Sequence, residues 1–160
     1  MLGKIKDSAA YISRYLDGEK YEIGIILGTG LGELGKSIEV KHTIPYAAIP
    51  HFPVSTVQGH KGNLLLGRFG DKNVIAMQGR FHFYEGYPMQ EVTFPVRVLH
   101  EIGVNKLFVS NAAGGVNTSF LVGDLMVITD HINLFPEHPL RGKNIDELGP
   151  RFPGMTDAYS

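Results

Sequence analysis

The sequence contains no cysteine. A disulfide framework, a zinc site with thiolate ligands and a cysteine nucleophile are therefore all excluded. Long apolar runs are also absent. Residues 1–16 mix charged with apolar side chains, unlike the apolar core of a signal peptide, and no run approaches the roughly 20 residues of a membrane span. These absences lead us to expect a cytoplasmic protein that makes no contact with a membrane.

An excess of charge of either sign is missing as well. Lys and Arg total 15, Asp and Glu total 16, and the net charge is −1. Electrostatic attraction alone therefore gives no reason to expect a nucleic-acid or anionic-membrane partner. The apolar share of 43 % is enough for a hydrophobic core, and 160 residues is the usual length of one domain.

The spacing of apolar residues predicts alternating helices and strands. Helices are expected over residues 4–17 and from Pro88 to Ile102, where Pro95 should delay or kink the second helix. Strands are expected over residues 21–27, 63–69, 73–77, 106–110 and 124–134, the second and third forming a hairpin, and residues 135–160 are typical of a loop. The alternation indicates a single α/β domain over residues 1–160, with a mixed, mainly parallel central sheet flanked by helices.

Two glycine-rich turns follow predicted strands, at Gly28–Gly32 and Asn111–Gly115. Backbone N–H groups in such turns bind anions, and ligands of α/β sheets bind at strand ends. Residues Gly30–Gly35 also fit the GxGxxG pattern of dinucleotide sites. That fingerprint needs an acidic residue about 20 positions further on, and none occurs between Glu39 and Asp71. A dinucleotide-dependent oxidoreductase is thus disfavoured, while a tight turn without a ligand stays open.

The segment Gln78–Pro88 combines cationic, aromatic and acidic side chains. Arg80 and His82 lie two positions apart, so an extended backbone places both on one face, where they form a good phosphate clamp. Tyr84 continues this alternation. Glu85 reaches the same side only if the backbone turns, as the glycine and proline that follow it indicate. A polar strand end without a ligand is the alternative interpretation.

The seven histidines show no metal-binding pattern, because there is no HExxH motif and no pair at helical spacing. We therefore expect no bound metal. No serine occupies a GxSxG elbow, which disfavours a serine hydrolase. His60 differs from the other histidines because it lies in the glycine-flanked turn Gly59–Gly62, just before a predicted strand.

Several motifs follow one another along the chain: Leu27–Gly32, Ile49–Pro53, Ser55–His60, Gln78–His82, Tyr84–Pro88, Asn111–Gly115, Asp130–Leu134 and Arg151–Pro153. Together they resemble the purine nucleoside phosphorylases of the low-molecular-mass, trimeric type. Members of this family convert a purine nucleoside and phosphate reversibly into the free base and a pentose 1-phosphate. The resemblance implies a homotrimer of nucleoside phosphorylase-like fold that uses inorganic phosphate as a co-substrate and needs no cofactor. Methylthioadenosine phosphorylases, which share the Gly-Thr-Gly turn but lack the Phe-Tyr-Glu-Gly-Tyr-Pro stretch, are an alternative.

The resemblance also implies roles for individual residues. The residues implied to bind phosphate are Thr29, His60, Arg80, His82 and, through its backbone N–H, Ala112. Those implied to act in catalysis are His60, His82 and Glu85. Those implied to contact the ribose are Tyr84 and Phe152, the latter reaching over from a neighbouring subunit.

The length is the one departure from the family. The resemblance implies that chains of the family continue for roughly another hundred residues beyond the point where this sequence ends, so a length typical of one domain does not make the chain complete. We therefore expect a chain truncated relative to the family, with a sheet that is incomplete at its C-terminal side and with part of the base pocket missing. An inactive or merely phosphate-binding fragment of such an enzyme is the alternative to an active phosphorylase.

Overall fold

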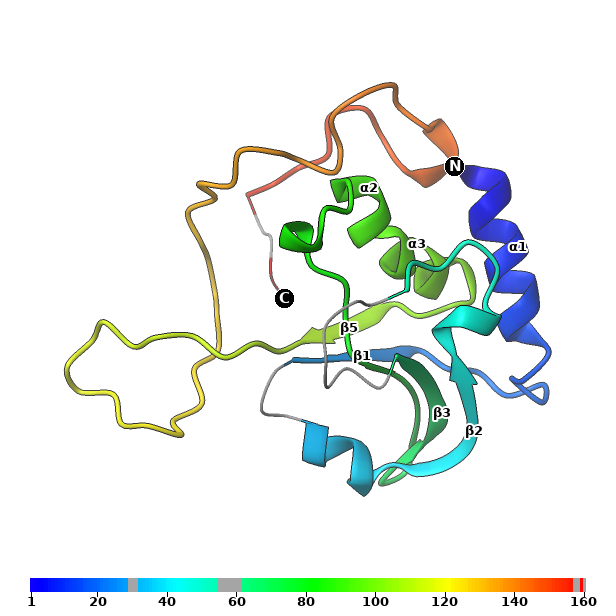
Figure 1. Cartoon of the computed structure of the whole chain (residues 1–160), viewed down its shortest axis with the longest axis horizontal. Coiled ribbons are helices and arrows are strands. Elements are labelled where there is room, and N and C mark those ends of the chain that lie inside the picture. Colours follow the sequence, from blue (N-terminus) through cyan, green and yellow to red (C-terminus); the bar gives the residue numbers. More distant parts are fainter. Residues whose placement is uncertain (29–31, 55–61, 157–158, 160) are drawn as a thin grey trace. The chain divides into compact units, whose positions relative to one another are not determined.

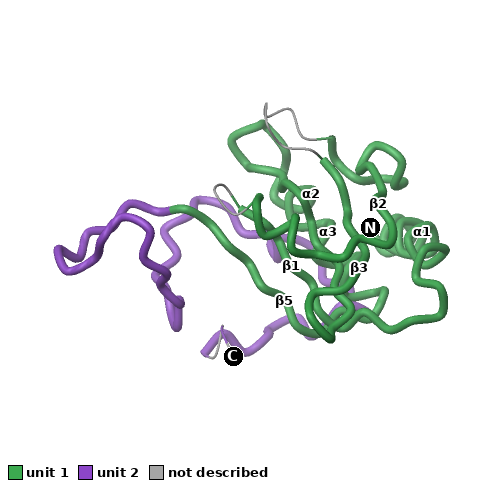
Figure 2. The backbone as a smooth tube through the Cα atoms, turned by 90° about the horizontal axis from the view of Figure 1, so that it is seen from below, with its two compact units in different colours: residues 1–112 green, residues 113–160 purple. Residues whose placement is uncertain are grey.

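The computed structural model describes residues 1–28, 32–54, 62–156 and 159. The chain divides into two compact units, residues 1–112 and residues 113–160, shown in different colours in Figure 2. The expectation of a single domain stays a prediction. Among the described residues, all α-helices and strands belong to the first unit, and the second contains one short 3-10 helix.

The first unit begins with a helix and alternates strands with helices after it (Figure 1). Its α-helices are α1 (Leu2–Ser13), α2 (Met89–Val92) and α3 (Phe94–Glu101). Its strands are β1 (Ile23–Leu27), β2 (Glu39–Pro45), β3 (Asn63–Phe69), β4 (Lys72–Gln78) and β5 (Lys106–Val109). Short 3-10 helices are η1 (Gly32–Ser37), η2 (Tyr46–Ala48) and η3 (Phe83–Glu85).

The strands form one mixed sheet in the order β2-β3-β4-β1-β5. Strand β1 is parallel to both β4 and β5, whereas the β2–β3 and β3–β4 pairs are antiparallel. The predicted mixed α/β fold is confirmed, and so is the predicted hairpin of β3 and β4. Strand β2 was not predicted, because only Ile44 among its seven residues is buried and an edge strand of this kind has no apolar periodicity.

Both faces of the sheet centre are covered. Four consecutive residues of β3 and four of β4 are buried, as expected for strands with packed neighbours on both sides. On one face, Val74 and Ala76 pack with Ile38, which follows η1. On the other face, Gly24 of β1 lets the Leu99 side chain of α3 approach to 3.6 Å from the position of a Cβ.

Helix α1 lies beside α3 (Figure 1) and buries Ile5 and Ile12 completely. It ends at Ser13, earlier than the predicted residue 17. The reason is local: the N–H groups of residues 14–16 donate to carbonyls three residues back instead of four, as in a turn. Asp17 and Gly18 then adopt positive φ angles of 52° and 74°, which end the right-handed path of the chain.

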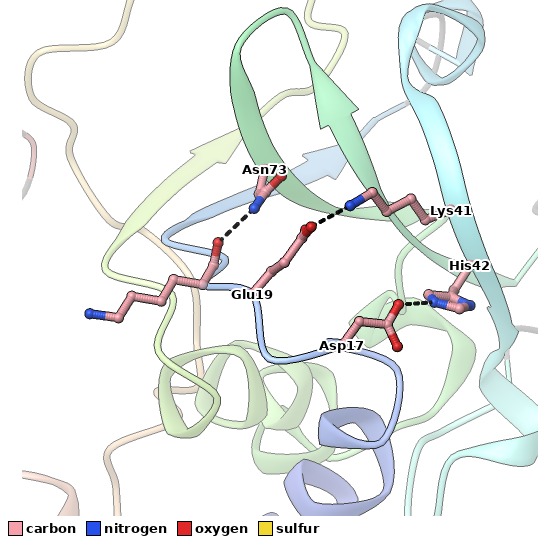
Figure 3. A network of polar contacts seen from close by, with 6 residues as sticks. Asp17, Glu19, Lys41, His42 and Asn73 are labelled. Carbon is pink, nitrogen blue, oxygen red and sulfur yellow. Dashed lines mark hydrogen bonds and ion pairs between the residues drawn. The ribbon is translucent and has the colours of Figure 1, made fainter.

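A network of polar contacts fixes the turn after α1 against β2 and β4 (Figure 3). Lys41 on β2 donates to Glu19 at 2.6 Å, and this hydrogen bond raises the pKa of the lysine. His42 pairs with Asp17 at 2.8 Å, and Asn73 on β4 donates to a backbone carbonyl of the same turn at 3.2 Å. These contacts therefore fix the position from which the chain leads into β1.

Proline placement explains the break between α2 and α3. Pro88 is the N-cap of α2, the helix is interrupted at Thr93, and Pro95 then lies in the first turn of α3. Proline is tolerated there because its missing N–H has no partner within the helix anyway. The predicted disruption by Pro95 is confirmed, and Gly103, with φ 107°, follows the end of α3 as expected.

The second unit consists of turns and extended segments, apart from η4 (Asp146–Leu148). The loop predicted over residues 135–160 is confirmed for its described part, whereas the strand predicted over residues 124–134 is wrong. Leu125 and Val127 are 90 % and 86 % exposed. An apolar, β-branched run becomes a strand only against a packing partner, and the described residues of this unit supply none. In the described part of the chain, no helix has the length and apolarity to span a membrane.

Gly67 of β3 lies opposite Val40, next to an irregularity in the β2–β3 register. A Cβ at this position would lie 2.4 Å from the carbonyl oxygen of Glu39. Because backbone atoms would have to move, we expect Gly67→Ala to lower the free energy of unfolding by about 1–3 kcal/mol. Urea denaturation followed by circular dichroism measures the change.

The matched control is Gly3→Ala on α1, where nothing lies within 4 Å of the added Cβ. Alanine is favoured over glycine in a helix by up to about 1 kcal/mol, so this variant should be as stable as the wild type or more stable. Identical unfolding curves for Gly67→Ala and the wild type would contradict the close backbone contact.

Candidate functional site

The carboxyl ends of three strands meet at one edge of the sheet. Strand β1 is parallel to β4 on one side and to β5 on the other, so all three chains leave the sheet in the same direction. Gly28 directly follows β1, Arg80 comes two residues after β4, and Ser110 directly follows β5. Ligands of open α/β sheets bind at this edge, which makes it the candidate site.

Arg80 connects the segment after β4 to the end of β5. Its Nε–H donates to Nε2 of His82 at 3.2 Å, and its Nη1 group donates to the carbonyl oxygen of Ser110 at 2.9 Å. Among the described residues, its Nη2 group has no hydrogen-bond partner. The guanidinium is therefore held along two edges and keeps a pair of N–H donors for a ligand.

His82 lies between Arg80 and Glu85 and contacts both through its ring. A guanidinium only donates hydrogen bonds, so Nε2 of His82 accepts from it. The ring proton is then on Nδ1, which donates to Oε1 of Glu85 at 2.9 Å. The two hydrogen bonds fix the tautomer and the orientation of the imidazole.

Glu85 reaches His82 because the backbone turns through η3. Its Oε1 also accepts the backbone N–H of His82 at 2.9 Å, which completes a capping box. Gly86 ends the turn with φ 91°. The predicted turn that brings Glu85 to the side of His82 is confirmed. The Glu85 side chain is only 2 % exposed, so its carboxylate depends on these donors.

Tyr84 adds an aromatic surface to the site. Its ring stacks on the His82 ring with a centroid distance of 4.7 Å and an interplanar angle of 20°. Because Tyr84 is 74 % exposed, the side of the ring facing away from the histidine is accessible to a ligand.

An aromatic cluster in the core anchors the segment after β4 that carries Arg80 and His82. Phe81 is buried and lies 5.3 Å from the ring of Tyr46 and 6.3 Å from that of Tyr87, measured between centroids. Phe52 in turn contacts Tyr46 at 5.7 Å. Since Phe81 points into the core, its two neighbours in the extended segment point away from it, as the sequence alternation predicted.

Ser110 also lies at this site, although no sequence motif predicted it as a site residue. Its hydroxyl accepts the backbone N–H of Gly28 at 3.0 Å and donates to the carbonyl of Ile26 at 3.1 Å. It therefore joins the end of β5 to the end of β1. The available signal was its position, directly after a predicted strand and directly before the turn Asn111–Gly115.

Four predicted site residues take no part in the contacts described above. Thr29 and His60 lie outside the described residues. Ala112 is exposed near the end of β5, and its carbonyl accepts the side-chain amide of Asn111 at 3.1 Å. Phe152 belongs to the second unit and is 88 % exposed. The roles of these four residues stay predictions. So do the ligand and catalytic roles expected of Arg80, His82, Glu85 and Tyr84, because contacts within the protein do not show what the site binds.

The described residues contain no group of three or more metal-ligating side chains close enough together to hold an ion. Besides His82, two further histidines pair with single carboxylates: His42 with Asp17 at 2.8 Å and His51 with Asp7 at 3.2 Å. Both pairs connect α1 or the turn after it to β2 or the segment after η2, which indicates a structural role.

The mixed sheet, with Arg80 and His82 just beyond the carboxyl end of β4, defines an α/β protein of the kind whose ligands bind at the carboxyl ends of parallel strands. The chain belongs to the Phosphorylase superfamily, because the model of that family matches residues 22–160.

Curated relatives narrow the comparison. Purine nucleoside phosphorylase 1 of Bacillus subtilis is 56 % identical over 159 residues, which cover 99 % of this chain and 58 % of the relative. Purine nucleoside phosphorylase 1 of Geobacillus stearothermophilus is 58 % identical over 139 residues, covering 87 % of this chain and 51 % of the relative. The resemblance seen in the sequence motifs is confirmed. The chain spans about half the length of the curated relatives that it matches.

A solved structure agrees with this comparison. Isoform 2 of purine nucleoside phosphorylase from Schistosoma mansoni, in complex with cytosine and ribose-1-phosphate, superposes with a TM-score of 0.89 at 46 % identity. The match covers 98 % of this chain and 56 % of that one.

The Tyr46 hydroxyl holds the backbone directly before Arg80, since it donates to the carbonyl of Gly79 at 2.8 Å. Burial raises the pKa of Tyr46 far above its ordinary value of 10.0. The folded protein thus keeps the phenol protonated at a pH where the unfolded chain ionises it. This contribution to stability is present below about pH 10 and is lost as the pH rises further.

We therefore expect Tyr46→Phe to be about 0.5–1.5 kcal/mol less stable than the wild type at neutral pH, because it lacks the hydrogen bond. Above about pH 10 this difference should shrink, because only the wild type loses the contribution of the protonated phenol. Urea unfolding at several pH values measures both effects. Tyr84→Phe, at an exposed ring, is the control, and a difference between wild type and Tyr46→Phe that is constant with pH would contradict the argument.

Proposed function

We propose that this protein acts in the phosphorolysis of purine nucleosides and that its residues 1–112 carry the phosphate-binding part of the site. The observation that carries the proposal is the arrangement of Arg80, His82 and Glu85 at the carboxyl edge of the parallel strands. Membership of the Phosphorylase superfamily and the identity to purine nucleoside phosphorylases support it.

Phosphate fits this site by charge and by geometry. The Nη2 group of Arg80 offers two N–H donors to phosphate oxygens, a charge-assisted arrangement. The proposed phosphate ligands beside Arg80 are His82, Thr29, His60 and the backbone N–H of Ala112. Glu85 acts through His82, whose ring it orients.

The reaction needs no nucleophile from the protein. A phosphate oxygen bonds to C1′ of the sugar while the bond between C1′ and the purine nitrogen breaks, and the purine leaves with the electron pair and takes up a proton. No electrons pass to or from a redox group, so the proposed reaction uses phosphate as a co-substrate and no cofactor. The transition state resembles an oxocarbenium ion, which a phosphate anion held beside it stabilises.

For the sugar we propose Tyr84, whose exposed ring lies against His82. Phe152 is the second proposed ribose contact, supplied by a neighbouring subunit of a homotrimer in the cytoplasm. The Schistosoma relative was solved with a base and ribose-1-phosphate, which supports ligands of this class for the family.

An assay of base release distinguishes purine nucleoside phosphorolysis from methylthioadenosine phosphorolysis and from phosphate binding without activity. The chain is mixed with inosine and phosphate, and release of hypoxanthine is followed by absorbance, with 5′-methylthioadenosine as the second substrate. Release from inosine supports the proposal, whereas release only from methylthioadenosine favours the alternative phosphorylase. Phosphate binding by calorimetry without any turnover would identify a phosphate-binding protein that lacks the activity.

Arg80→Ala tests the site itself. We expect phosphate binding to weaken by about 1.5–3 kcal/mol, the range for hydrogen bonds to charged groups. Isothermal titration calorimetry with inorganic phosphate measures the affinity.

Arg68→Ala is the matched control, because it removes an exposed cation at the far end of β3 and leaves the strand ends of the site intact. It should bind phosphate as the wild type does. Equal affinities of Arg80→Ala and the wild type would refute the assignment of Arg80.

A further inference from the structure

Ser110 makes four hydrogen bonds that end on three other residues. Its hydroxyl accepts the N–H of Gly28 at 3.0 Å and donates to the carbonyl of Ile26 at 3.1 Å. Its own N–H donates to the same carbonyl at 3.2 Å, and its carbonyl accepts from Nη1 of Arg80 at 2.9 Å. We call Ile26, Gly28, Arg80 and Ser110 the Ser110 junction. It links the segments that follow β1, β4 and β5.

The contact between Gly28 and Ser110 is too close for any side chain at position 28. A Cβ there would lie 2.1 Å from the carbonyl oxygen of Ser110 and 2.8 Å from its carbonyl carbon. Because the two backbones approach so closely, the N–H of Gly28, the residue directly before Thr29, reaches the Ser110 hydroxyl and donates to it.

The carbonyl of Ser110 sets the plane of the Arg80 guanidinium. The planar group is held by Ser110 at Nη1 and by His82 at Nε. With these two contacts fixed, the direction of the remaining Nη2 donors is fixed as well, because the guanidinium is rigid. A shift of Ser110 would therefore move the backbone of Gly28 and change the direction of the Nη2 donors of Arg80.

We propose that Ser110 is a positioning residue for anion binding: it holds the backbone of Gly28 and the Arg80 guanidinium in fixed relative positions without touching the anion itself. This inference rests on the proposed function, because the anion is the phosphate of the reaction. The hydroxyl fixes the position of Ser110 through two side-chain hydrogen bonds to the end of β1, and the carbonyl of the residue placed in this way accepts from Arg80.

The experiment compares Ser110→Ala, Ser110→Thr and the wild type. Threonine keeps the hydroxyl and suits the end of a strand, whereas alanine removes the hydroxyl and leaves the backbone carbonyl in place. Ser37→Ala is the control, since Ser37 is an exposed serine of the same unit at the end of η1. Calorimetry with inorganic phosphate gives affinity and stoichiometry, and NMR hydrogen exchange reports on the Gly28 amide.

For Ser110→Ala we expect a phosphate Kd raised about 3- to 10-fold, as for loss of a neutral hydrogen bond, with unchanged stoichiometry. The Gly28 amide should exchange faster in this variant. Ser110→Thr and Ser37→Ala should match the wild type in both measurements. A variant that was merely less stable would lower the stoichiometry and leave the Kd of the folded molecules unchanged.

Three outcomes would overturn the inference. If Ser110→Ala binds phosphate with the Kd of the wild type, Ser110 has no positioning role. The same follows if the Gly28 amide of this variant exchanges as slowly as in the wild type. Equal weakening in Ser110→Ala and Ser110→Thr shows that the hydroxyl is not the cause. If the wild-type chain binds no phosphate at all, the proposed function is refuted, and the role of Ser110 falls with it. The three outcomes above refute only the role of Ser110, so the two kinds of failure can be told apart.

Discussion

The parallel pairing of β1 with both β4 and β5 is the constraint on which the rest of the structure depends. Because β1 lies between two parallel neighbours, the three carboxyl ends meet, and residues more than 80 positions apart, such as Gly28 and Ser110, share a hydrogen bond. Small residues make the arrangement possible. Gly24 accepts the side chains of α3 and of the segment after it, and Gly28 accepts the backbone at Ser110.

A continuous series of polar contacts runs from that meeting point into the loop after β4. Ser110 accepts from Arg80, Arg80 donates to His82, and His82 donates to Glu85. The buried carboxylate at the end of the series would be costly without the two N–H groups that it accepts. Phe81, in the middle of the same loop, is anchored in the aromatic cluster. The loop is thus held by polar contacts on one side and by apolar packing on the other, which suits a site that works by positioning charge.

The two units are stabilised in different ways. Residues 1–112 bury long apolar side chains from both helices and strands around the sheet. In residues 113–160, Asn117, Asp124 and Asn144 accept or donate hydrogen bonds to neighbours within five positions, and the contact of Tyr159 with His131 spans 28 positions. The apolar residues of this unit, such as Leu125 and Val127, are exposed. Local turns fix the backbone over a few residues only, so the candidate site is built from the first unit, where distant segments are held together by a core.

The sequence by itself determined the features with local causes. The apolar run of β1, the hairpin at Gly70, the interruption by Pro95 and the alternation of Arg80, Phe81 and His82 all follow from neighbouring residues. Tertiary structure alone decided the rest. Strand β2 forms because β3 offers it an edge. Residues 124–134 form no strand, because the described residues offer them no partner strand. Ser110 gains its role only when β1 and β4 arrive beside it, since its hydrogen bonds end on residues far away in the chain, and no local pattern encodes such a meeting.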